Sequence, residues 1–273
     1  MSNLIRTIGK LLPDCDVPWT LTIKHFYYFG GNFFERNEKL DTELNWQRLR
    51  TYHPFFKLPE TEAEWRSQCE FGKEKDGQDG CLPEKAENLV KVLKTHNIKH
   101  LVSISAGEAC LEYHIKKNYP ELKLTLTEYT LDNVEVLKKV FKNCESVIKL
   151  DALKADWSQF AQKKDVCLLF FRLDASFDDQ ELRKIFDNLY QAGVVNIIYV
   201  PNLFLTVKFL LFEKFRAFLN RILGKNLTFA GYFRTKKRSH SFWCDLYQVE
   251  DINLCGSGSI KHGAARGVFL KRM

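Results

Sequence analysis

The chain has 273 residues, of which 45% are hydrophobic and 27% are charged. This composition is typical of a globular protein with a substantial core and argues against an intrinsically disordered chain. The length allows one large domain, or one domain with an extension. The formal net charge of +7 at pH 7 favours an anionic partner but is too small to require nucleic acid.

The N-terminus does not have the pattern of a secretory signal, because Arg6 and Lys10 interrupt its apolar residues. The eight cysteines form no close pairs along the sequence, and a core of this size does not need disulfides. We therefore expect reduced thiols and a cytoplasmic location. His53, Cys69 and Cys81 lack the spacing of zinc ligands, so we predict no metal site.

Residues 1–82 have no regular alternation of elements and are predicted to form an N-terminal extension. Within it, 19–29 has the pattern of a strand, and 43–52 and 61–69 have the pattern of short helices. Residues 72–80 are polar and rich in glycine, which is typical of a loop.

Strands and helices alternate regularly from residue 83 onwards. This alternation predicts an α/β fold, in which a Rossmann-like, mostly parallel sheet carries helices on both faces. The predicted strands are 101–105, 122–127, 146–150, 165–171 and 194–200, and the predicted helices are 84–97, 108–118, 131–143 and 178–192.

The C-terminal part departs from this alternation. Residues 227–234 and 241–249 are both strand-like, and 235–240 joins them. This connection is too short for a parallel crossover, so we predict an antiparallel hairpin that closes the sheet and ends the regular domain at residue 250. Residues 251–273 have the composition of a flexible tail.

Residues 194–212 are nearly all apolar, but Pro201 and Asn202 divide them, so a membrane span is not expected. The second part begins a predicted helix over 202–224. This helix carries more apolar surface than one core-facing stripe requires, and its charges are mostly basic. The excess would be explained by packing against the N-terminal extension or a second copy, or by contact with an anionic membrane surface.

The most informative stretch runs from residue 100 to residue 114. An apolar strand stops at Ser105, Ala106 and Gly107, and a helical pattern starts directly afterwards. The unpaired N–H groups at such a turn can hold the polar end of a cofactor. The next strand ends in Glu128, at a position suited to binding the hydroxyls of a ribose.

In this order of elements and motifs, residues 84–250 resemble the class I S-adenosylmethionine-dependent methyltransferases. Residues 105–109 stand where the family has Gly-x-Gly-x-Gly, and they keep only the middle glycine; Ser103 stands where an acid is common. The resemblance implies S-adenosylmethionine as cofactor, with Glu128 on the ribose and Asp151 on the adenine amino group. The implied cofactor-binding residues are Ser105, Ala106, Gly107, Glu128, Asp151 and Ala152.

The resemblance also implies that catalytic or acceptor-facing residues follow the fourth strand, where Arg172 and Asp174 lie. Asp174 is expected to take a proton from an acceptor hydroxyl, and Arg172 to bind an anionic acceptor. This segment lacks the Asn/Asp-Pro-Pro-aromatic motif of nucleic-acid amino methyltransferases. We therefore expect methyl transfer to a small-molecule, saccharide or lipid-linked acceptor, at oxygen, with the N-terminal extension on the acceptor side.

Two other functions are compatible with the sequence. The first is an NAD(P)-dependent oxidoreductase, although Ser105 replaces the first glycine of its fingerprint and the terminal hairpin is foreign to it. The second is a non-catalytic binding protein on a degenerate methyltransferase fold, which the altered glycine loop allows. Each residue also has a structural alternative: Gly107 as a turn glycine, Glu128 as a solvated acid, and Asp151 or Asp174 as a helix cap.

Overall fold

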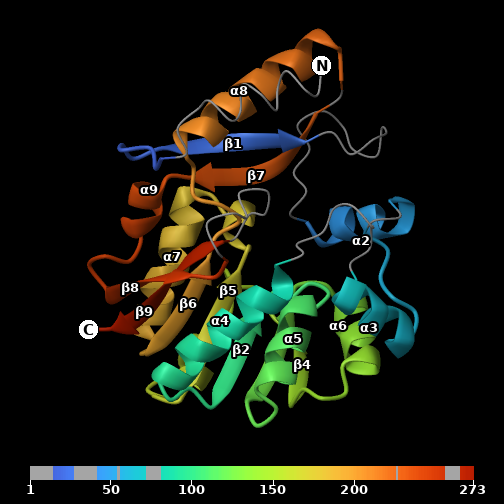
Figure 1. Cartoon of the computed structure of the whole chain (residues 1–273), viewed down its shortest axis with the longest axis vertical. Helices are drawn as coiled ribbons and strands as arrows, with labels where there is room; N and C mark the ends of the chain where they lie inside the picture. Colours follow the sequence, from blue (N-terminus) through green and yellow to red (C-terminus); the bar gives the residue numbers. More distant parts are fainter. Residues whose placement is uncertain (1–14, 28–41, 54–55, 72–80, 226, 256–264) are drawn as a thin grey trace.

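The structure, a computed structural model, describes residues 15–27, 42–53, 56–71, 81–225, 227–255 and 265–273. Its centre is a seven-stranded sheet with the strand order β4-β3-β2-β5-β6-β9-β8 (Figure 1). The strands are β2 (His100–Ile104), β3 (Lys123–Glu128), β4 (Ser146–Lys149), β5 (Val166–Phe171), β6 (Asn196–Val200), β8 (Tyr247–Asn253) and β9 (Arg266–Arg272).

The five strands from β4 to β6 are parallel, and β9 lies antiparallel between β6 and β8. From β2 the chain builds the sheet outward through β3 and β4, then returns to build the other side through β5 and β6. The carboxyl ends of β2 and β5 therefore border a topological switch point, where open α/β sheets bind ligands.

Successive strand residues pack into two different cores, one on each face of the sheet. Leu101 and Leu169 belong to the core under the first group of helices, whereas Val102 and Leu168 belong to the core under the second group. The first group is α4 (Leu82–Thr95), α5 (Cys110–Asn118) and α6 (Leu131–Val140); the second is η2 (Trp157–Phe160) and α7 (Asp179–Gln191). The predicted α/β fold with helices on both faces is confirmed.

The predicted closing hairpin exists, but different residues form it. Residues 228–234 form β7, which pairs with β1 (Thr22–Tyr27) in a separate two-stranded sheet. The predicted turn 235–240 contains the short helix α9 (Lys236–His240), because the Thr235 side chain accepts a hydrogen bond from the Arg238 N–H and caps it. The hairpin that closes the main sheet is β8 with β9.

The predicted flexible tail is wrong for residues 251–255 and 265–273. Residues 266–272 form β9, and Val268, Phe269 and Leu270 are buried between β6 and β8. The glycine-rich residues 256–264, which suggested a tail, lie outside the described residues, as does the predicted loop 72–80.

The remaining elements lie on the carboxyl side of the sheet. Helices α2 (Glu43–Tyr52) and α3 (Glu62–Phe71) come from the N-terminal extension, and α3 contacts α5 and α6. Helix α8 (Val207–Ile222) is shorter than the predicted 202–224, and the β1–β7 sheet lies between it and the main sheet (Figure 1). Among the residues that the structure describes, no helix is long and apolar enough to cross a membrane.

Gly231 lets β7 pack closely against the 3-10 helix η3 (Asp174–Ser176). A Cβ at this position would clash with the carbonyl oxygen of Ala175. Gly231→Ala is therefore expected to lower the free energy of unfolding by roughly 2–4 kcal/mol. Urea denaturation measures the change.

Gly224→Ala is the matched control, since Gly224 also has a positive φ but nothing lies within 4 Å of its added Cβ. It should cost only the backbone strain, about 1 kcal/mol. Equal losses in the two variants would show that Ala175 does not hold β7 closely.

Candidate functional site

The loop after β2 has an unusual backbone. Ser105, Gly107 and Ala109 adopt left-handed conformations, with φ values of 53°, 62° and 55°. These are the three positions at which the glycine motif places its glycines. A left-handed conformation costs a residue with a Cβ about 1–2 kcal/mol. The loop therefore keeps the backbone of a glycine motif although two of the three glycines are absent.

Hydrogen bonds fasten this loop to the end of β3. The Ser105 N–H donates to Thr127 Oγ1 at 3.2 Å, and the Ala106 N–H donates to the Thr127 carbonyl at 2.9 Å. The Gly107 N–H donates to Glu128 Oε1 at 2.8 Å. From the other side, Trp65 Nε1 of α3 donates to the Glu108 carbonyl at 2.7 Å. The loop is thus held in one conformation by β3 and by the N-terminal extension.

Glu128 is buried at the carboxyl end of β3. Burial raises the pKa of its carboxyl group, while the hydrogen bond from Gly107 opposes that shift. Its second oxygen accepts from the Tyr129 N–H at 3.0 Å. Asn133 also interacts with this carboxyl group by a side-chain hydrogen bond. A carboxylate has about four acceptor positions, so room remains for a hydroxyl donor such as that of a ribose.

Asn133 is a further candidate site residue, which was not predicted from the sequence. Its Nδ2 donates to the Gly107 carbonyl at 2.6 Å, and its buried Oδ1 has no hydrogen-bond partner. Nothing lies within 4 Å of a Cβ built on Gly107. An unused acceptor and open space beside the loop fit the polar end of a bound cofactor. The sequence signal for Asn133 was a polar residue at a buried position in the first turn of α6.

Asp151 and Ala152 follow β4 at the same edge of the sheet. Asp151 Oδ1 accepts from the Leu153 N–H at 3.0 Å, and Ala152 is buried. Asp151 does not cap a helix over 152–161. The only helix in that range that the structure describes is the 3-10 helix that begins at Trp157, and Asp156 caps it. The Asp151 carboxyl group, which is partly exposed, keeps acceptor positions for an adenine amino group.

Arg172 lines a cavity of about 160 Å³ beside the switch point. Its φ is 60°, and its N–H donates to the Val200 carbonyl at 2.7 Å, so the chain turns sharply after β5. Its Nε donates to Asn202 Oδ1 at 2.9 Å. The cavity is lined by Trp46, Arg172, Ala175, Ser176, Asn202, Phe229, Ala230 and Gly231.

Asp174 does not line this cavity. Its side chain is buried, and Oδ1 accepts from the Asn202 N–H at 2.8 Å, while its carbonyl accepts from Arg234 Nη1. Burial raises the pKa of its carboxyl group to about 6. The structure therefore does not support the predicted direct contact of Asp174 with an acceptor. The Asp174 carboxylate instead binds the backbone of Asn202, which itself lines the cavity. The buried Oδ2 of Asp174 has no hydrogen-bond partner.

Helix α2 covers the ends of β3 and β4 and contributes Trp46 to the cavity. Arg50 Nη1 donates to Asp132 Oδ1 at 2.8 Å and also to Thr130 Oγ1. Glu43 forms an ion pair with Lys149 at 3.0 Å. The sequence alone gave no partner for this helix, so Trp46 was not identified as a site residue. The acceptor-side role of the extension stays a prediction.

Ser103 stands where the methyltransferases that this chain resembles commonly have an acid. Here a carboxyl group is supplied by Glu112, which pairs with Ser103. Ser103 Oγ in β2 donates to Glu112 Oε1 at 2.5 Å, and Glu112 lies on α5. Burial raises the pKa of Glu112 to about 7, and the Glu128 charge adds to the shift. A carboxyl group thus lies beneath the loop, although a helix supplies it rather than the strand.

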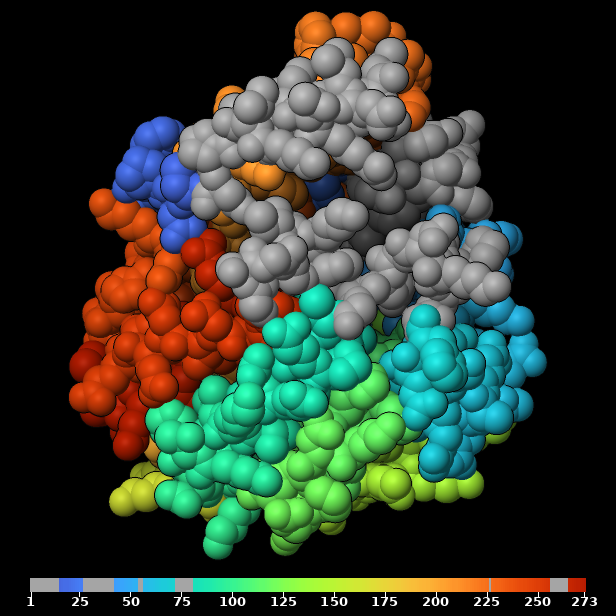
Figure 2. All heavy atoms as spheres, in the orientation of Figure 1, coloured from blue at the N-terminus to red at the C-terminus, as the bar shows by residue number. Residues whose placement is uncertain are grey.

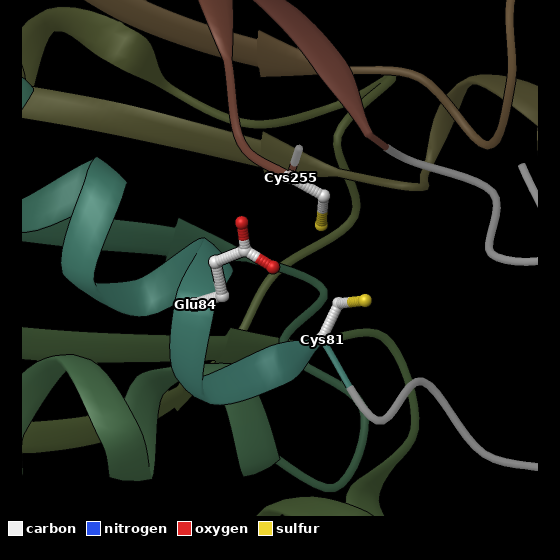
Figure 3. A group of neighbouring side chains, drawn as sticks. All are labelled: Cys81, Glu84 and Cys255. Carbon is white, nitrogen blue, oxygen red and sulfur yellow. The ribbon is translucent and has the colours of Figure 1, made fainter. Parts of the chain in front are cut away.

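A cluster of possible metal ligands lies elsewhere at this edge (Figure 3). Ligand atoms of Cys81, Glu84 and Cys255 lie within 4.8 Å of one another. Burial raises the pKa of the Cys255 thiol, which disfavours the thiolate form that a metal ion would require. We therefore assign no metal to this cluster.

The fold was compared with known proteins. Neither family models nor curated protein sequences gave a match. The mitomycin 7-O-methyltransferase MmcR is similar in structure, with a TM-score of 0.51 and 16% identity over 70% of this chain and 54% of that chain. This chain thus matches only about half the length of MmcR.

Two other solved structures match over nearly their whole length. Magnesium protoporphyrin IX methyltransferase from Synechocystis PCC 6803, determined with bound SAH, has a TM-score of 0.51 and 11% identity over 84% of this chain and 99% of that chain. The methyltransferase domain of bacterial CtHen1-C has a TM-score of 0.50 and 13% identity over 71% and 99%. The chain therefore has the fold of class I S-adenosylmethionine-dependent methyltransferases.

The strained loop gives a stability prediction. Ser105→Gly and Ala109→Gly should each raise the free energy of unfolding by up to about 1 kcal/mol, because relief of strain exceeds the added freedom of the unfolded chain. Ala106→Gly is the control: Ala106 lies between two of these positions without a positive φ, so it should lose about 0.5–1 kcal/mol. Chemical denaturation compares the three. Destabilisation of all three variants alike would contradict the strained backbone.

Glu112 gives a pH prediction. Burial raises its pKa from an ordinary value of 4.5 to about 7, so the folded protein retains the proton to higher pH than the unfolded chain. The stability contributed is present below about pH 4.5 and lost as the pH rises through about 7. Glu112→Gln keeps a neutral acceptor for Ser103. It should be more stable than the parent by roughly 1–3 kcal/mol at pH 8 and similar at pH 4.5. A difference independent of pH would contradict this.

Proposed function

We propose that this protein transfers a methyl group from S-adenosylmethionine to an acceptor oxygen. The observation that carries the proposal is the left-handed backbone at Ser105 and Ala109. That conformation costs backbone energy at both residues, and such strain persists only where the surrounding structure or a function requires it. A binding loop that must present its backbone to a cofactor supplies such a requirement.

The proposed cofactor site uses the loop and the ends of two further strands. Glu128 would accept from the ribose hydroxyls, and Asp151 from the adenine amino group, while Gly107 leaves space for the rest of the molecule. The bound cofactor would supply a methyl group on a sulfonium, which is a good leaving group. The protein's part is then to align the acceptor and to exclude water.

The proposed acceptor site is the cavity beside Arg172. Trp46 and Phe229 offer aromatic walls, and Arg172 and Asn202 offer polar groups. Among the described residues that line the cavity, none carries a carboxylate or an imidazole, so no side chain there would act as a base. An acceptor that arrives already ionised, such as a carboxylate or a phenolate, needs none. We therefore favour a small acidic acceptor with an aromatic or otherwise apolar body.

Glu128→Ala tests the cofactor assignment. Loss of the ribose contacts should weaken S-adenosylmethionine binding by about 1–3 kcal/mol. Calorimetric titration with S-adenosylmethionine, its demethylated product and NAD measures the affinities and separates methyl transfer from nicotinamide chemistry. Glu121→Ala removes an exposed acid near the opposite edge of the sheet and should change nothing. Unaltered affinity in folded Glu128→Ala protein, or tighter binding of NAD, would rule out the assignment.

Arg172→Met tests the acceptor assignment. Acceptors are first identified by transfer of labelled methyl from S-adenosylmethionine to a panel of small carboxylates, phenols and neutral alcohols. For an ionised acceptor, the variant should lower kcat/KM by about ten- to a hundredfold, since a hydrogen bond to a charged group is lost. Cofactor affinity should stay within about twofold. Equal losses for charged and neutral acceptors would show that Arg172 supports the fold of the site rather than binding an anion.

A further inference from the structure

Helix α8 is amphipathic, but it exposes its apolar stripe and turns a polar side toward the protein. Across Val207–Ile222, all of which the structure describes, the one buried residue is the acid Glu213. An ordinary surface helix buries its apolar stripe and exposes its charges. The inward side of α8 is instead joined to the β1–β7 sheet largely by polar groups.

The polar inner side is well satisfied. Glu213 forms a hydrogen bond with His25 Nδ1 at 2.9 Å and an ion pair with Arg216 at 2.8 Å. Arg216 also donates to the Phe26 carbonyl at 2.6 Å. One aromatic contact adds to these, between the rings of Phe209 and Phe233, whose centroids are 5.4 Å apart. These contacts fix the rotation of α8 about its own axis, so that the opposite side of the helix faces outward.

That outer side carries a continuous apolar stripe. Leu211, Phe215, Phe218 and Ile222 recur every three or four residues, so they share one face of the helix. With the adjoining Phe212 and Leu223, they are between 44% and 65% exposed. Single exposed apolar residues need no explanation, but a contiguous set on one helix marks an interaction surface.

Basic residues accompany the stripe. Lys214 and Arg221 are exposed and lie seven residues apart, which places both along the same side of it. The sole acid between residues 207 and 225 is Glu213, which is buried and paired with Arg216. The outer side of α8 therefore combines exposed phenylalanine and leucine with positive charge and no negative charge.

We propose that α8 docks on an anionic lipid surface, with its apolar stripe in the interface and its basic side chains at the headgroups. An interfacial helix has this composition, and it binds through buried apolar area and attraction to anionic lipid together. A second copy of the chain is a poorer occupant, because it would bring the basic residues of two stripes together without an acid to offset them.

The position of α8 suits this role. It lies at one end of the molecule, where its atoms are orange in Figure 2, and the β1–β7 sheet separates it from the main sheet (Figure 1). The same β7 carries Phe229 and Gly231 into the cavity beside Arg172. The strand that supports α8 thus also lines the proposed acceptor site, and the apolar stripe lies on the far side of the β1–β7 sheet from the main sheet (Figure 1).

Vesicle flotation of the full chain tests the proposal. We expect binding to vesicles of phosphatidylcholine with about one-third phosphatidylserine at low salt, with weaker binding at high salt and to pure phosphatidylcholine. Lys214→Glu/Arg221→Glu and Phe215→Ser/Phe218→Ser should each lower the partition coefficient by roughly tenfold or more. Neither pair changes a buried contact, so both variants should fold.

Lys123→Glu/Lys271→Glu is the matched control. It changes the net charge equally, but both lysines are exposed at the opposite, amino edge of the sheet. It should keep vesicle binding within about twofold. A loss as large as that of the α8 charge variant would overturn the proposal by showing general charge attraction. Absence of flotation at low salt would also overturn it. If light scattering then showed a dimer, and Phe215→Ser/Phe218→Ser abolished that dimer, the stripe would be an interface with a second copy of the chain.

The proposal is independent of methyl transfer. Calorimetric titration with S-adenosylmethionine on the same variants separates the two, because none of these residues lies in the cofactor site. Retained cofactor affinity without vesicle binding would remove only the lipid surface. Vesicle binding without cofactor affinity would remove only the proposed reaction.

Discussion

The hydrogen bond from the Gly107 N–H to the Glu128 carboxylate, at 2.8 Å, joins the two strand ends on which the candidate site depends. It requires the loop after β2 to turn its amide toward β3. The left-handed conformations at Ser105 and Ala109 make that turn, at a cost in backbone strain. Thr127 on one side and Trp65 on the other then keep the loop in place. The N-terminal extension is therefore part of the site and not only a cover over it.

The parallel sheet and its site-bearing edge could be predicted because the relevant signals are local. Each buried strand is a short apolar run, and each ends at a polar or small residue, as at Ser105 and Glu128. The carboxyl ends of parallel strands share one edge, so residues at these ends come together whatever the loops between them. The altered glycine motif suggested a weakened site, whereas the structure shows that its backbone conformation is retained.

The parts that could not be predicted depend on contacts between distant segments. β7 looks like half of a hairpin, yet its partner is β1, about 200 residues earlier in the sequence. β9 was interpreted as a tail because glycines precede it, although Val268 to Leu270 form a buried strand. Asp174 follows β5, but nothing in the sequence shows that its side chain points inward to Asn202 instead of toward the cavity. Trp46 reaches the cavity only because Arg50 and Glu43 attach α2 to the ends of β3 and β4.

A crystal structure of the chain with the demethylated cofactor, S-adenosylhomocysteine, would locate the cofactor site. We expect a nucleoside at the carboxyl edge of the sheet, with its ribose hydroxyls on Glu128, and unchanged left-handed conformations at Ser105 and Ala109. The sulfur of S-adenosylhomocysteine should face the cavity beside Arg172. A ligand bound elsewhere, or a Glu128 carboxylate that makes no contact with the ribose, would show that the proposed cofactor site is wrong.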